Sequence, residues 1–322
     1  MTRAVKPAVW LSALFVIAVA VLTPLVGSTH IDLQRAFAGE SPDHEIFFYA
    51  RLPRVILGLL SGAALSVTGV LFQCMLRDPL AEPYTLGVSS GASVGAVFAI
   101  CLGFHSTGIA SLVGAGTVLL IVLGTAVDGR RLSSFTLLLT GVTMNSICFA
   151  LILFLHSVAS FTQSFAISRW LMGGLDAVEY STLGWLAAIV LVVCVAAIAL
   201  APKWNLLSIG GEWAASRGVS TTALTLAGYV GGSVLTGIVT SLTGPIGFVG
   251  LIVPHALRLR LGADHRTLLP CSMFLGAAFL TLSDTLARTV IAPAEIPVGV
   301  LTALCGGPFF LWLLKSKRQS LW

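Results

Sequence analysis

The residue types that do chemistry in enzymes are sparse in this sequence, and they are not grouped. Its six histidines lie in different segments, and no HExxH pattern brings metal ligands together. The cysteines contain no CxxC pair and all lie inside apolar stretches, so we interpret them as small buried hydrophobic residues. They are Cys74, Cys101, Cys148, Cys194, Cys271 and Cys305. The sequence therefore predicts neither a catalytic residue nor a metal site.

Charged groups that could drive transport are equally few. A phosphate-binding P-loop needs a lysine directly after a glycine, and none of the four lysines follows one. The one acid clearly inside an apolar stretch is Asp284, and we expect Arg288, one helical turn later, to pair with it. An ion-coupled carrier usually has ionisable residues at mid-membrane. The scarcity of ionisable residues argues against an ion-coupled carrier but does not exclude one, because carbonyl groups alone can bind sodium.

The composition is that of a chain that crosses a membrane many times. Of its 322 residues, 57% are hydrophobic and 10% are charged, and the mean hydropathy is +0.98, whereas soluble domains have about 25% charged residues. The net charge of +5 is spread between apolar stretches and forms no patch that would bind nucleic acid. We therefore predict an all-α, polytopic membrane protein whose single domain spans residues 1–322.

Ten apolar stretches are long enough to cross a bilayer at roughly 20 residues each. They cover about 8–26, 55–76, 86–104, 109–127, 133–156, 182–201, 223–241, 245–261, 268–287 and 297–314. The first is long for a signal peptide, and residues 27–30 directly after it offer no A-x-A cleavage site, so we interpret it as a span. Glycines and prolines between 244 and 254 predict a short or discontinuous helix there. A similar proline-containing break lies between 69 and 87, and the two halves are inverted repeats if the first break is cytoplasmic and the second external; sequence similarity alone does not establish this.

Basic residues are distributed unevenly between the two sides of this arrangement. With the N-terminus inside, thirteen of the eighteen arginines and lysines lie in cytoplasmic segments. Only Arg35, Arg51, Arg54, Arg169 and Arg288 lie outside. Because positive residues resist translocation during insertion, this asymmetry predicts that both termini are cytoplasmic.

The largest polar connection on the predicted cytoplasmic side, about 203–221, contains a short helical pattern. Glu212 to Arg217 are mostly good helix formers, and Gly218 follows them as a plausible C-cap. We therefore expect a short helix outside the bilayer. From the residues alone, an ordinary solvated helix is the simpler interpretation.

Several long motifs occur in a fixed order along nearly the whole chain. They are Arg51-Leu52-Pro53-Arg54, Asp78 to Pro83 leading into Leu86 to Ala92, Trp170 to Gly174, Gly247 to His255, Asp264-His265-Arg266 and Glu295 to Ala303. In this order they resemble the FecCD-type permeases of siderophore, haem and vitamin B12 importers. One departure is Asp78, where that family commonly has asparagine, so a cytoplasmic turn gains a negative charge.

The resemblance implies a type II ABC importer permease fold in a bacterial cytoplasmic membrane. It implies a second permease subunit, identical or closely paralogous, with the substrate path along the two-fold axis. Two ATP-binding subunits would bind the cytoplasmic side, and a periplasmic or lipid-anchored solute-binding protein would bind the outer face. This chain would itself bind no cofactor, because ATP and Mg belong to the partner ATPase.

The resemblance also implies roles for individual residues. Arg51, Arg54 and Arg288 match positions that dock the solute-binding protein, although an ion pair with Asp284 and snorkelling to lipid headgroups are simpler alternatives. The coupling helices that contact the ATPase match the loop containing Gly211, Glu212, Ala215, Arg217 and Gly218. The cytoplasmic gate matches Asp78, Leu80, Ser134 and Phe135, for which a packing role is the alternative.

Three function classes follow from the sequence. The leading hypothesis is the permease of a binding-protein-dependent, ATP-driven importer for an iron chelate, either a ferric siderophore or haem, or for a cobalamin-like substrate. The alternatives are an ion-coupled secondary carrier and an intramembrane enzyme. The apolar path has no charge pattern matched to one chelate, so the sequence does not select the substrate.

Overall fold

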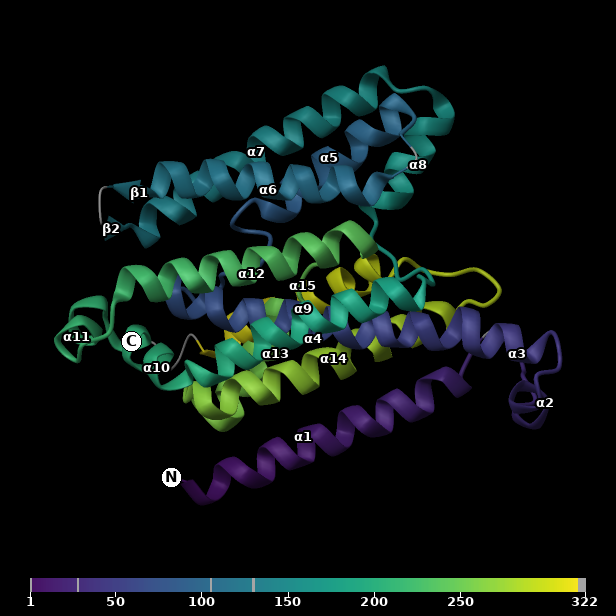
Figure 1. The fold of residues 1–322 in the computed structure, drawn as a ribbon, viewed down its shortest axis with the longest axis horizontal. Coiled ribbons are helices and arrows are strands. Elements are labelled where there is room, and N and C mark those ends of the chain that lie inside the picture. The colour runs from purple at the N-terminus through teal and green to yellow at the C-terminus, as the bar shows by residue number, and fades with distance from the viewer. Residues whose placement is uncertain (1, 28, 105, 129–130, 318–322) are drawn as a thin grey trace.

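In the computed structural model, which describes residues 2–27, 29–104, 106–128 and 131–317, long helices run side by side along the length of the molecule (Figure 1). Each of the ten predicted spans corresponds to one helix. These are α1 (Thr2–Leu22), α4 (Leu52–Leu76), α5 (Val88–Leu102), α6 (Thr107–Ala126), α7 (Ser134–Val158), α9 (Tyr180–Ala199), α12 (Thr221–Thr243), α13 (Val249–Leu261), α14 (His265–Thr289) and α15 (Val298–Lys317). The all-α, multi-pass fold predicted from the sequence is confirmed.

Within the described residues, seven helical segments are long and apolar enough to cross a membrane. The segment that contains α4 begins at Asp43, because a short helix and a π-helical turn at Ile46–Arg51 extend it without interruption. The helices α5 and α13 have only 15 and 13 residues. Both begin at a backbone break inside the bundle, which is the physical reason that they are short.

Short elements gather at the two ends of the bundle (Figure 1). At one end, here named the α2 end, lie α2 (Leu33–Ala38), α3 (Asp43–Glu45) and α8 (Phe161–Leu171). At the other, the α11 end, lie α10 (Ala201–Ile209), α11 (Gly211–Ser216) and an antiparallel hairpin of β1 (Val127–Asp128) and β2 (Arg131–Leu132). None of these short elements except α11 was predicted from the sequence.

The helix α4 forms the centre of the bundle, and α12, α13 and α14 pack around it. Its small residues allow backbones to touch: a Cβ at Gly62 would overlap the Gly276 carbonyl of α14, and a Cβ at Gly69 would overlap the Gly250 carbonyl of α13. Without a strong hydrophobic force between helices in lipid, such close van der Waals packing is a main source of association. The core of the molecule is therefore a tight assembly of α4 with its neighbours.

The two proline-containing breaks contact each other inside the bundle. The break between α4 and α5 carries Glu82, whose carboxylate accepts a hydrogen bond from the backbone N–H of Phe248 at 3.3 Å. Phe248 is the N-cap of α13, with a positive φ of 70°. A carboxylate at a helix N-terminus satisfies a free N–H and complements the helix dipole. Glu82 thus joins the start of α13 to the connection that follows α4.

Candidate functional site

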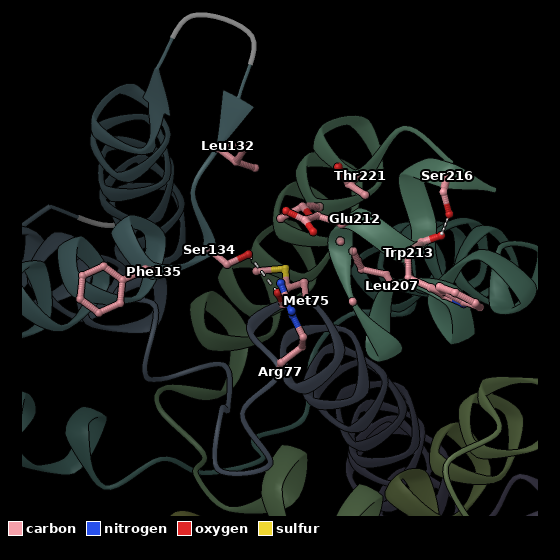
Figure 2. A pocket seen from close by; sticks show the side chains of 13 residues that line it. Met75, Arg77, Leu132, Ser134, Phe135, Leu207, Glu212, Trp213, Ser216 and Thr221 are labelled. Atoms are coloured by element: carbon pink, nitrogen blue, oxygen red, sulfur yellow. Dashed lines mark hydrogen bonds between the residues drawn. The ribbon is translucent and has the colours of Figure 1, made fainter. Parts of the chain in front are cut away.

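A cavity of about 1030 Å³ lies at the α11 end, where four segments of the chain converge. The end of α4, the stretch around the start of α7, the α10–α11 turn and the start of α12 all contribute to it. Its lining comprises Met75, Arg77, Leu132, Ser134, Phe135, Leu207, Gly210, Gly211, Glu212, Trp213, Ser216, Thr221 and Thr225. Figure 2 shows Ser134 and Phe135 on one side of Met75 and Arg77, and Glu212 and Trp213 on the other.

The predicted coupling residues lie on or directly after α11. The helix ends as expected: Gly218 has a φ of +78°, and its N–H donates to the Ala215 carbonyl at 2.9 Å. Ala214 is fully buried and fixes one face of the helix, whereas Glu212 and Ala215 are exposed. The Arg217 guanidinium lies 4.9 Å from the centre of the Trp213 ring, within cation–π range. The exposed face of α11 therefore presents an acid, a small residue and an arginine held on a tryptophan.

The predicted gate residues divide into two pairs. Ser134 and Phe135 line the cavity at the start of α7, where the Ser134 hydroxyl donates to the Met75 carbonyl at 3.0 Å. Phe135 is 74% exposed although it is a large apolar residue. Asp78 and Leu80 lie in the turn directly after α4 and do not line the cavity. There the Asp78 carboxylate accepts from the Leu80 N–H at 2.9 Å, which closes an Asx turn.

Sequence reasoning missed Met75, Arg77 and Trp213 in this cavity. Arg77 ends α4 in a left-handed conformation, with φ 52°, and a Cβ at Gly211 would lie 3.9 Å from its guanidinium. The polarity of Arg77 directly after an apolar span was the available signal. The fold thus brings predicted gate residues and predicted coupling residues to one cavity, with Arg77 between them.

A cluster of charges lies at the opposite, α2 end. Asp284 of α14 has a side chain only 3% exposed, and it accepts from Nε and Nη2 of Arg54 at 3.0 and 2.9 Å. Arg288 Nε lies 3.7 Å from the same carboxylate. The i,i+4 pair expected from the sequence is therefore present, but Arg54, from α4, makes the closer contact. Arg54 Nη1 also lies 3.0 Å from Glu295, which is 48% exposed.

Two of the three predicted docking arginines are buried in this cluster. Arg51 and Arg288 are each 5% exposed. Arg51 donates to the carbonyls of Pro24, Leu25 and Thr29, and Arg288 donates to the Thr23 carbonyl. Both arginines therefore donate to carbonyls of the short 3₁₀ turn, Thr23–Leu25, and the loop that follow α1. Arg54 is the most exposed of the three, with 17% of its side chain accessible.

Arg54 and Glu295 also border a second cavity, of about 650 Å³, at the α2 end. Arg169, from α8, lies on its rim and is exposed. Backbone hydrogen bonds join its lining segments: Gly174 donates to the Thr243 carbonyl at 2.8 Å, and Gly299, beside the lining residue Val298, donates to the Gly173 carbonyl at 3.3 Å. Charged side chains and glycine backbone therefore both contribute to this cavity.

Comparison with known proteins identifies the family. The FecCD transport family matches residues 13–316. The chain belongs to the FecCD transport family. Among its curated relatives is a hemin transport system permease protein, HmuU, of Yersinia pestis, 38% identical over 283 residues that cover 85% of this chain and 84% of the relative. A vitamin B12 import system permease protein, BtuC, of Klebsiella pneumoniae is 38% identical over 276 residues, covering 83% and 82% of the two chains.

Solved structures support the fold of this FecCD protein. A metal-chelate type ABC transporter in an inward-facing conformation aligns with a TM-score of 0.85 and 30% identity, covering 97% of this chain and 99% of that one. PsaBC from Streptococcus pneumoniae aligns with a TM-score of 0.55 at 18% identity, which shows a shared fold. This FecCD protein therefore has the type II ABC permease fold, and the resemblance inferred from its motifs is confirmed.

Proposed function

We propose that this chain is the permease subunit of a binding-protein-dependent, ATP-driven importer of an iron chelate, haem or a cobalamin-like cofactor. The observation that carries the proposal is the cavity at the α11 end. The gate residues Ser134 and Phe135 and the coupling residues Gly211 and Glu212 all line it. A movement of α11 relative to the start of α7 would change the shape of this cavity. ATP binding by a partner would thus open or close the path by alternating access.

The α11 end is the cytoplasmic side in this proposal. There α11 presents Glu212, Ala215 and Arg217 to an ATP-binding subunit, and the turn of Asp78 and Leu80 lies next to the same surface. Two such subunits would use ATP and Mg, while a second permease chain completes the path across the two-fold axis. Both termini then lie in the cytoplasm of a bacterial cell whose inner membrane holds the protein.

At the outer, α2 end, the charge cluster supports docking of a solute-binding protein. Three arginines, Arg51, Arg54 and Arg288, face two acids, Asp284 and Glu295, which leaves one positive charge in excess. Because Glu295 is half exposed, an acidic side chain of the partner can replace it at Arg54. Arg51 and Arg288, which are buried, contribute positive potential and hold the end of α1 in place.

The ion-coupled carrier is disfavoured because Asp284, which is buried, and Glu82, which is partly buried, already have partners within the chain. Asp284 is neutralised by two arginines, and Glu82 is held by the N-terminus of α13. Among the described residues, no group of three or more metal-binding side chains is present. The relatives named for haem and for vitamin B12 support a large chelate or corrinoid as cargo, and neither name selects one of them.

The test is purification of the tagged chain from its host in mild detergent, followed by reconstitution into liposomes. We expect a separate Walker-type ATPase to co-purify, and uptake of haem, a ferric siderophore or cobalamin to require ATP. A thermal-shift screen of the co-encoded binding protein against these three compounds would identify the cargo. Uptake that an ion gradient drives without ATP would contradict the proposal and support the secondary carrier.

A further inference from the structure

The short helix α2, outside the two sites described above, has three distinct faces. Ala36 is fully buried against the protein, and Gln34 and Arg35 are exposed and polar. The third face carries Leu33 and Phe37, which are four residues apart and therefore lie one above the other. They are 39% and 70% exposed. An exposed apolar face on an ordered helix is a candidate surface for contact with an apolar partner.

This segment is held firmly, so the exposure of Phe37 does not arise from a loose chain. The Asp32 carboxylate caps α2 by accepting from the Gln34 N–H at 2.9 Å, and the His44 Nδ1 lies 2.9 Å from the Ala36 carbonyl. The Phe37 ring packs edge-on against that of Phe48, with centroids 5.7 Å apart. The rest of the Phe37 ring is exposed although this contact holds it in place.

The position of α2 matches the boundary of the membrane. Figure 1 shows α2 just beyond the end of α1, next to α3. The Tyr180 hydroxyl, at the start of α9, donates to the Phe48 carbonyl, which sets Phe48 level with the end of that span. Tyr180 and Tyr49 are 44% and 65% exposed, as expected of an aromatic belt at a lipid headgroup region. That region is about 5–8 Å thick on each side of a bilayer. The ring centroids of Phe37 and Phe48 are 5.7 Å apart, so both rings fit within that thickness.

We propose that α2 lies in the membrane interface, with Leu33 and Phe37 inserted at the boundary between headgroups and acyl chains. The occupant of the open face is bilayer lipid, because Phe37 packs against Phe48, which is hydrogen-bonded to the start of α9. The outer surfaces of α1 and α9 carry apolar side chains such as Leu22 and Trp185, which are 59% and 75% exposed. Arg35 and Glu40, on the same segment, have side chains that are more than half exposed and 3.9 Å apart. Insertion of Leu33 and Phe37 would fix the position of the segment that joins α1 to Arg51, whatever substrate the protein transports.

Spin labels on the full chain in liposomes test the proposal. In a cysteine-free background, Phe37→Cys and the matched control Arg35→Cys are labelled, and collisions with oxygen and with a water-soluble nickel chelate are compared. Oxygen concentrates in lipid and the chelate in water. We expect the oxygen-to-nickel ratio at 37 to exceed that at 35 by at least about threefold.

A second label keeps the test valid if loss of the Phe37 ring disturbs the aromatic contacts. Leu33→Cys lies on the same face and should give the same raised ratio. Equal ratios at 33, 35 and 37 would overturn the proposal and place α2 in water. A label at 37 that contacts water in the bilayer but is shielded when the co-encoded binding protein is added would also overturn it, because the face would then belong to that protein.

Discussion

Replacing Asp284 with asparagine tests the interpretation of the charge cluster most directly. The substitution keeps the shape of the side chain but removes the only buried carboxylate that Arg54 and Arg288 share, at 2.9 and 3.7 Å. The three side chains are 3%, 17% and 6% exposed, so water screens the loss poorly. Removing one partner of a buried ion pair typically costs about 3–5 kcal/mol.

For Asp284→Asn we expect the lower part of that range. Arg54 keeps Glu295, and Arg288 keeps its bond to the Thr23 carbonyl. A loss of about 3 kcal/mol lowers the folding equilibrium constant roughly 100-fold. The free energy of unfolding is measured by titrating SDS into mild-detergent micelles and following helix content by circular dichroism.

The matched control is Glu295→Gln, which removes the exposed partner of the same arginine. Because exposed ion pairs contribute at most about 1 kcal/mol, this variant should remain near the wild type. The double variant Arg54→Gln, Asp284→Asn should lose less than the sum of the two single variants, because the arginine no longer lacks its anion. If Asp284→Asn is no less stable than Glu295→Gln, or if the two changes are additive, the cluster does not stabilise the fold as argued.

Three further predictions follow from individual contacts. Ser216→Cys should react with an impermeant maleimide only after the inner face is opened, and Glu40→Cys should react in intact cells; the reverse pattern would invert the proposed orientation. Gly62→Ala should lower the yield of folded protein, because its Cβ would overlap the backbone of α14, whereas Gly116→Ala, with nothing within 4 Å, should be tolerated; equal yields would show that the α4–α14 contact is not tight. Burial alone would raise the pKa of Asp264, but hydrogen bonds from the Asn205 side chain and the Arg266 N–H, with nearby positive charges, lower it. A lowered pKa means that this carboxylate stabilises the fold above its unfolded pKa of about 4 and loses that effect as the pH falls below that value. The difference in melting temperature between the wild type and Asp264→Ala should therefore shrink as the pH is lowered. A difference that stays constant with pH would refute the direction of the pKa shift.

The spans were predictable because each depends on local composition. The ten apolar stretches coincide with ten helices, and the break expected after 243 lies at 244–248. The C-cap at Gly218 was predictable for the same reason, since glycine adopts its positive φ without strain.

Contacts between distant segments were not predictable in this way. The stronger partner of Asp284 is Arg54, 230 residues away, and the i,i+4 rule could point only to Arg288. The contact between Glu82 and Phe248 could not be predicted, since no spacing in the sequence relates the two residues. The small helices at the α2 end are fixed by tertiary contacts, because six or fewer residues do not form a stable helix alone.

The backbone contact between α4 and α14 also has a consequence for biosynthesis. α4 ends at Leu76 and α14 begins at His265, so about 190 residues must be translated between them. At a bacterial elongation rate of about 5–20 residues per second, that interval lasts roughly 10–40 seconds. During it, the side of α4 that carries Gly62 has no α14 backbone to pack against. Chains that stop short of α14 keep this face open, which gives cellular quality control a simple feature by which to recognise an unfinished transporter.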